Sequence, residues 1–173
     1  GVTPMDPRTL AGERAYGGQE GKGVAEAMAA APQAIVNAQN MLSQIDSLYD
    51  DPGLWWSVGG MGWTPNIPGN PQAGTISRIE QLQGQTFLQA FESLKGGGQI
   101  TEIEGVKATN AIARLQRSQN YDEYRAALKE LRDVVATGLE RAKLQANGQY
   151  VPGKGIVTPS GNTTSSGVTW SVE

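Results

Sequence analysis

The chain of 173 residues contains no cysteine and no histidine, and these two absences exclude several kinds of chemistry. Without cysteine there are no disulfides, thiolate metal sites or cysteine nucleophiles. Without histidine the chain lacks the usual general base, the Ser-His-Asp triad and the commonest metal ligand. Carboxylates are the only ordinary acid or base groups left near neutral pH. We therefore expect no bound metal and no cofactor.

Positive charge and long apolar runs are also scarce. The chain has 14 Lys and Arg against 17 Asp and Glu, a formal net charge of -3. Nucleic-acid binders usually carry a basic excess, so we expect no direct sequence-specific nucleic-acid binding. No apolar run approaches the roughly 18 to 20 residues of a transmembrane helix, and no secretory signal is visible. The first residue is Gly1 rather than Met, as in a processed product, a fragment or a chain without its initiator.

The C-terminal residues 148–173 are rich in Gly, Ser, Thr and Pro and predict an extended tail. Such a segment has too little apolar surface to order itself. Val168, Trp170 and Val172 alternate with polar residues, which is typical of a short strand, and no other strand is predicted. We expect these three residues to bind a partner, by adding a strand to the edge of its sheet.

Residues 32–147 carry the periodicity of amphipathic helices and predict one bundle domain. Residues 1–31 are rich in Gly, Pro and charge and predict an irregular N-terminal arm. An Ala-rich stretch at its end could be helical, but Pro32 interrupts it. The predicted bundle helices cover about residues 33–49, 75–95, 101–116 and 121–145. The predicted apolar stripe of the first helix is Ile35, Ala38, Leu42, Ile45 and Tyr49, and that of the last helix is Tyr124, Leu128, Leu131, Val135, Leu139 and Ala142.

Turn and capping signals predict a central helical hairpin. The glycines of residues 96–98 end one helix, and Thr101 with Glu104 three residues later begins the next as a capping box. Asn120, followed by two acids, is typical of the N-cap of the last helix. The predicted fold is all-α: a small helical bundle of about four helices with extended N- and C-terminal arms.

A long connection, residues 52–74, contains four of the nine prolines and three of the four tryptophans. Long connections in compact domains are often functional. Trp55, Trp56 and Trp63 either cover the open end of the bundle or form a contact surface, because tryptophan commonly anchors protein interfaces. Both interpretations stay open at this point, and we take the three residues as candidate partner-binding residues.

Glu102 and Glu104 are the nearest approach to paired catalytic carboxylates. Residues two apart on a helix point in different directions, and Glu104 already has a capping role. The glycines of residues 96–98 lack the context of a phosphate-binding loop, and the pair of acids at residues 50–51 lacks EF-hand spacing. We expect no catalytic, cofactor-binding or metal site, and no enzyme.

Several blocks of the sequence carry a family resemblance. They are DPGL at Asp51–Leu54, PG at Pro68–Gly69, the stretch RIEQLQGQ…ATNAIARL at Arg78–Leu115, and YDEYRAALKELRDVV at Tyr121–Val135. In this order they resemble a helical protein family encoded among the virion and structural genes of tailed bacteriophages and prophages. That family is described as structural or associated with DNA ejection. The resemblance covers about half of the chain and carries no catalytic residues.

The resemblance implies a phage virion structural component in the head-tail connector, the tail or the set of ejected proteins. Its partners would be other virion proteins and copies of itself, and it would lie in the host cytoplasm before assembly. One alternative is an accessory domain of a peptidoglycan-degrading ejection or tail protein. Residues 91–93, Phe-Glu-Ser, are similar to the helix-end Glu-Ser of phage lytic transglycosylases, but the surrounding motifs are missing. A soluble prophage adaptor is a further alternative.

Overall fold

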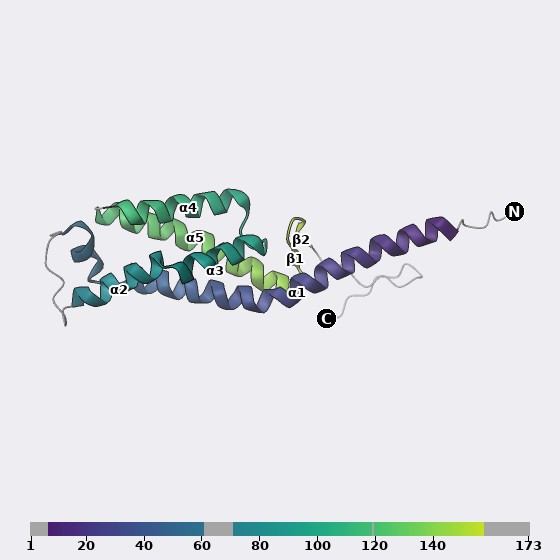
Figure 1. Cartoon of the computed structure of the whole chain (residues 1–173), viewed down its shortest axis with the longest axis horizontal. Helices are drawn as coiled ribbons and strands as arrows, with labels where there is room; N and C mark the ends of the chain where they lie inside the picture. Colours follow the sequence, from purple (N-terminus) through teal and green to yellow (C-terminus); the bar gives the residue numbers. More distant parts are fainter. Residues whose placement is uncertain (1–6, 61–70, 119, 158–173) are drawn as a thin grey trace, which may run out of the picture.

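A computed structural model describes residues 7–60, 71–118 and 120–157, with side chains described over residues 22–59, 73–118 and 120–157. Figure 1 shows an elongated molecule built almost entirely of helices. The elements are α1 (Pro7–Tyr49), a π-helical turn η1 (Trp56–Gly60), α2 (Pro71–Gln83), α3 (Gln85–Gly96), α4 (Glu102–Arg117), α5 (Tyr121–Ala146), β1 (Tyr150–Val151) and β2 (Gly155–Ile156). The all-α prediction is confirmed.

The helices form four rods, because α2 and α3 follow one another along the same side of the bundle. α1 runs beside α5, α4 packs on α5, and α2 and α3 pack on α1. The predicted helical bundle is therefore present. α3 and α4 follow one another across a short turn, as predicted, but their main packing partners are α1 and α5 rather than each other.

One apolar core runs between the rods. Leu131 in the middle of α5 is fully buried, as its place in the predicted stripe requires. In α1 the buried positions are Ala31, Ala34, Ala38, Met41, Ile45 and Leu48, and the predicted stripe members Ile35, Leu42 and Tyr49 lie partly buried at the margin of the core. The core-facing stripe is thus rotated by about one residue from the predicted one, because two neighbouring rods share the burial of α1.

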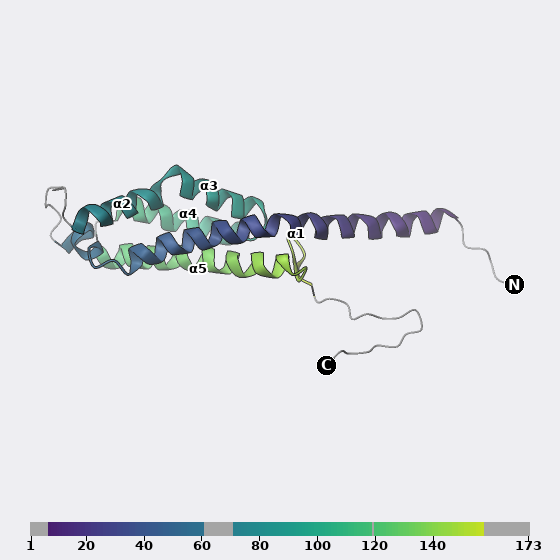
Figure 2. The ribbon, with the colours of Figure 1, turned by 90° about the horizontal axis from the view of Figure 1, so that it is seen from below.

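The predicted irregular arm over residues 1–31 is wrong for residues 7–31, which are helical, and Pro32 lies inside α1. An interior proline removes one backbone hydrogen bond and costs about 3 kcal/mol or more. Tertiary contacts on both sides of Pro32 offset this cost: Ala31 and Ala34 are buried in the bundle. An arm does exist, but it is a helix that extends past the bundle (Figures 1 and 2).

The single helix predicted for residues 75–95 is two helices in the structure. Gly84 takes an extended conformation, with φ -73° and ψ 160°, and serves as the N-cap of α3. α2 also begins earlier than predicted, at Pro71, so the connection predicted for residues 52–74 is shorter. A glycine inside a helix already costs roughly 1 kcal/mol relative to alanine, so the chain leaves the helical conformation there at little extra cost.

The predicted capping signals are confirmed. Thr101 and Glu104 form the capping box at the start of α4, and the Asn120 side chain accepts hydrogen bonds from the first turn of α5. Gly98 has a positive φ of 77°, which suits a glycine at the end of α3.

The prediction of an extended tail from residue 148, with its one strand at Val168–Val172, missed a hairpin in the first part of this segment. Tyr150–Val151 and Gly155–Ile156 pair as a small antiparallel hairpin. The Tyr150 ring is buried, and its hydroxyl donates to the Gly98 carbonyl at 2.8 Å. This contact joins residues 52 apart in the sequence, which no local pattern could predict. Residues 158–173 lie outside the described residues.

Candidate functional site: the tryptophan end of the bundle

Asp51 holds the chain where α1 ends and the tryptophan segment begins. Its carboxylate accepts hydrogen bonds from the Gly53 amide at 2.8 Å, from the Thr75 hydroxyl at 2.9 Å and from Arg78 of α2. Burial raises the pKa of Asp51, but these hydrogen bonds and the Arg78 charge outweigh it and lower the pKa below its usual value. A side chain at Gly53 would collide with Thr75. The start of the segment is therefore fixed against α2.

After this junction, the apolar side chains of residues 54–58 lie on two sides of the segment, some buried and some exposed. Leu54 and Val58 are buried in the core and anchor the segment. Trp55 and Trp56 are 43% and 48% exposed, and their rings meet edge to face with centroids 4.6 Å apart. Leu54 and Val58, rather than Trp55 and Trp56, thus cover the end of the bundle. The two indoles form an exposed aromatic pair.

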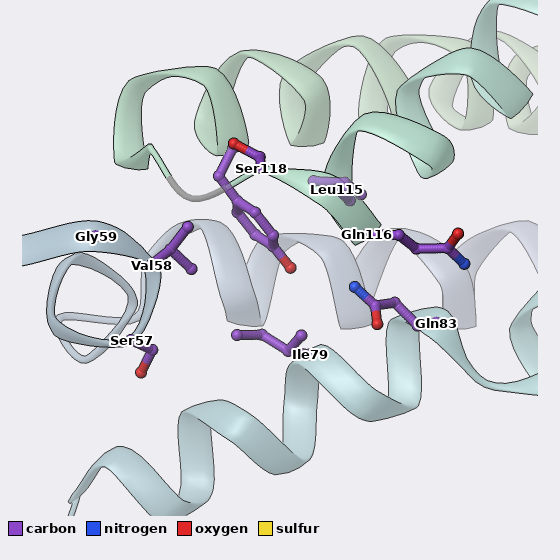
Figure 3. Close-up of a pocket in the computed structure, with 9 residues that line it drawn as sticks. Ser57, Val58, Gly59, Ile79, Gln83, Leu115, Gln116 and Ser118 are labelled. Atoms are coloured by element: carbon purple, nitrogen blue, oxygen red, sulfur yellow. The ribbon is translucent and has the colours of Figure 1, made fainter. Parts of the chain in front are cut away.

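A cleft of about 580 Å³ opens beside this segment, between η1, α2, the end of α4 and the start of α5. Figure 3 shows side chains from three of these elements around a common space, among them Val58, Ile79 and Leu115. Its volume falls in the roughly 300 to 1,000 Å³ range of ligand pockets. No charged residue is found among those described residues that line the cleft, which are Ser57, Val58, Gly59, Ile79, Gln83, Leu115, Gln116, Ser118 and Tyr124.

Tyr124 lines the cleft with a hydroxyl that forms no hydrogen bond to another described residue. Its side chain is only 2% exposed, and its hydroxyl is buried with no hydrogen-bond partner among the described residues. Burial raises the pKa of this hydroxyl, so it stays protonated and neutral at physiological pH. Leaving a buried hydroxyl unpaired costs about 1 to 3 kcal/mol. A ligand that bonds to it would recover part of that free energy.

The structure locates two of the six predicted partner-binding residues. Trp55 and Trp56 lie together on the surface next to the cleft. The remaining four, Trp63, Val168, Trp170 and Val172, lie outside the described residues. The cleft itself was missed from sequence, where Tyr124 was read only as a member of the core stripe. The one available signal was a tyrosine in place of an aliphatic residue in that stripe.

Glu104 is fully engaged in structural contacts. Its carboxylate accepts hydrogen bonds from the Thr101 amide at 2.9 Å and from both terminal nitrogens of Arg141, one of them at 2.9 Å. The hydrogen bond from Arg141 lowers the pKa of Glu104 to about 2, more than burial raises it. The carboxylate is ionised at neutral pH and has no proton to donate to a leaving group. This arrangement supports the predicted capping role of Glu104.

Charged side chains of α4 and α5 form ion pairs on the surface. Arg114 pairs with Glu130, and Arg132 of α5 reaches Asp46 of α1. Exposed pairs of this kind contribute little to stability. In the described part of the chain, no three acidic side chains are grouped closely enough to hold a metal ion. The described helices also include none with the length and apolarity needed to cross a bilayer.

Comparison with known proteins adds no assignment: no family model, curated protein or solved structure matches the chain.

Proposed function

We propose that this chain is a structural component of a phage particle that acts by packing against other proteins, without catalysing a reaction. The family resemblance of residues 51–135 suggests the phage setting. Geometric support for a packing role comes from the helix that extends past the bundle and from the exposed indole pair.

The extended helix is the observation that carries the proposal. Contacts of α1 with the bundle reach Ala27, whose carbonyl accepts a hydrogen bond from Gln145, and Met28, which lies near Gly148. Closer to the N-terminus, α1 runs clear of the other helices in both views (Figures 1 and 2).

The composition of this free part of α1 makes it a poor helix by itself. Residues 7–23 include five glycines, each costing roughly 1 kcal/mol relative to alanine. Isolated helices of about 12 to 15 residues are marginal even when they are rich in alanine. We infer that another protein in the particle packs against this segment and stabilises the helix.

The exposed pair of Trp55 and Trp56 supports the same role at the other end of the molecule. Tryptophan is enriched among the residues that contribute most to protein interfaces. A partner that covers both indole rings would bury their apolar surface. Asp51 and Leu54 anchor the backbone of this segment, so the rings are held in place before the partner binds. We propose other virion proteins as the partners, in the particle and, before assembly, in the host cytoplasm.

The test is recovery of the chain with purified virions, quantified by mass spectrometry. We expect a fixed copy number per particle, and a reduced copy number for the double variant Trp55→Ser, Trp56→Ser. Ile103→Ser is the matched control, because Ile103 is an 83% exposed apolar residue on α4. A chain absent from virions and found only in host cytoplasm would contradict the proposal and favour the prophage adaptor.

The peptidoglycan alternative has its own test on the same protein. A cell-wall hydrolysis assay of the purified chain should show no activity. Hydrolysis that Glu104→Gln or Glu92→Gln abolishes in a folded protein would replace the packing role by an enzymatic one.

A further inference from the structure

We infer that the cleft beside Tyr124 receives the C-terminal segment of a second copy of this chain, with Trp170 as the inserted side chain. The inference rests on the proposed packing role and names one partner and its binding site. It depends on the chemistry of the cleft, the composition of the tail and the position from which the tail leaves the bundle.

The cleft suits a neutral aromatic side chain with one hydrogen-bonding group. Ile79 and Leu115 supply apolar wall, while Gln83 and Gln116 supply amides, and no charged residue is found among the described lining residues. Among the described residues the Tyr124 hydroxyl has no hydrogen-bond partner. An indole buries a large apolar ring and has a single N–H donor, for which the hydroxyl oxygen is an acceptor.

The tail matches this neutral environment. Residues 158–172 contain no charged side chain, and their polar residues are hydroxyls and one amide, the same groups that line the rim of the cleft. Trp170 is the single aromatic residue in this stretch. It stands at the centre of the alternating Val168 to Val172 segment, so an extended backbone places it on one face of the strand.

The tail begins at the far end of the bundle from the cleft. The described chain ends at Val157, after the hairpin that follows α5, whereas the cleft lies at the start of α5 (Figure 1). Tyr124 of the cleft lies 22 residues before Ala146, the last residue of α5, so the cleft and the end of the helix are about 33 Å apart at 1.5 Å per residue. The 13 residues from Val157 to Trp170 span at most about 43 to 47 Å.

Insertion into the cleft of the same copy would therefore require a chain stretched along the bundle to roughly three quarters of its full length. A chain stretched this far gives up much of its conformational entropy. A second copy placed end to end brings its cleft close to the start of the tail and avoids this cost. The contact uses two different surfaces, so it is heterologous and builds a ring or a filament of copies.

Sedimentation velocity of the full-length protein over a concentration series tests the inference. The wild-type chain should self-associate. Trp170→Ala should lose association, whereas Thr169→Ala, its neighbour on the opposite face of the strand, should keep it. Gln116→Trp should block the cleft and also lose association. Asn110→Trp is its control, because Asn110 is likewise exposed on α4 but does not line the cleft. Tyr124→Phe should weaken association about two- to tenfold, the loss of one hydrogen bond.

A mixture of two variants gives the decisive result. Trp170→Ala keeps an intact cleft, and Gln116→Trp keeps an intact tail, so each should be monomeric alone. Together they can form one tail-to-cleft contact and should give a 1:1 dimer and nothing larger. No dimer in the mixture, or wild-type association that survives Trp170→Ala, would overturn the inference.

Other occupants of the cleft predict different outcomes. If the tail fills the cleft of its own copy, the wild-type chain is monomeric and hydrogen exchange near Tyr124 rises in Trp170→Ala. If Trp63 fills it, that exchange responds to Trp63→Ala and not to Trp170→Ala. Either result overturns docking between copies, and neither bears on recovery with virions, which tests the packing role separately.

Discussion

Replacing Glu104 by glutamine separates the two structural roles of this carboxylate. Glutamine can still complete a capping box, because its amide oxygen can accept from the Thr101 amide. It cannot keep the charged pair with Arg141, a residue 37 positions away that bonds both carboxylate oxygens. The sequence alone predicts a negligible effect for Glu104→Gln, whereas the structure predicts a measurable loss of stability.

The size of the loss follows from the geometry of the pair. Hydrogen bonds to charged groups contribute about 1.5 to 3 kcal/mol when well formed. The Arg141 and Glu104 side chains are 23% and 25% exposed, so solvent screens part of that energy. We expect Glu104→Gln to lower the free energy of unfolding by about 1 to 2.5 kcal/mol at pH 7. Glu102→Gln, an exposed residue in the same helical turn, should cost less than about 1 kcal/mol.

The pH dependence gives an independent check. The pKa of Glu104 falls from 4.5 to about 2 on folding. Its stabilising contribution is therefore fully present above pH 4.5 and is lost as the pH falls toward 2. Urea unfolding of the wild-type chain and Glu104→Gln should show a stability gap that is constant at neutral pH and closes over this interval. Equal stability at pH 7, or a gap that persists at pH 2, would refute the assigned ion pair.

Three further substitutions test the core, the junction and the cleft. Leu131→Ala removes a fully buried side chain and should cost about 2 to 5 kcal/mol in denaturant unfolding; an unchanged midpoint would show that this face of α5 is not core. Asp51→Asn should cost about 1 to 3 kcal/mol, and the wild-type advantage should shrink below pH 3.8, because folding lowers the pKa of Asp51 from that value. Tyr124→Phe should leave the thermal stability of the unassociated chain unchanged or raised, since its hydroxyl has no partner in the described part of the chain; a clear loss would reveal a hydrogen bond to that group.

The features of the fold that were predicted correctly from the sequence are those that depend on residues close together in the chain. The capping box at Thr101 and the N-cap at Asn120 were predicted correctly, because each involves groups within three residues of one another. The apolar stripe of α5 was predicted for the same reason, since its periodicity is a property of one helix. Local signals were less reliable where tertiary packing also influences the backbone. Pro32 was predicted to interrupt a helix, yet α1 continues through it. One helix was predicted across Gly84, yet the helix breaks there.

The candidate site shows the same division. Its tryptophans were recognised from composition, but their exposure depends on Leu54 and Val58 turning into the core in their place. The cleft is lined by residues from η1, α2, α4 and α5, and the arrangement of these four elements leaves the Tyr124 hydroxyl without a hydrogen-bond partner among the described residues.

The sequence by itself determined the helical class, the ends of α4 and the start of α5, because backbone hydrogen bonds and caps form between near neighbours. The tertiary structure decided that α1 continues through Pro32, which way the indoles face, and that Glu104 pairs with Arg141. These features depend on contacts between residues far apart in the chain. Their free energy comes from burial and charge pairing between helices, which appear only after the helices have packed.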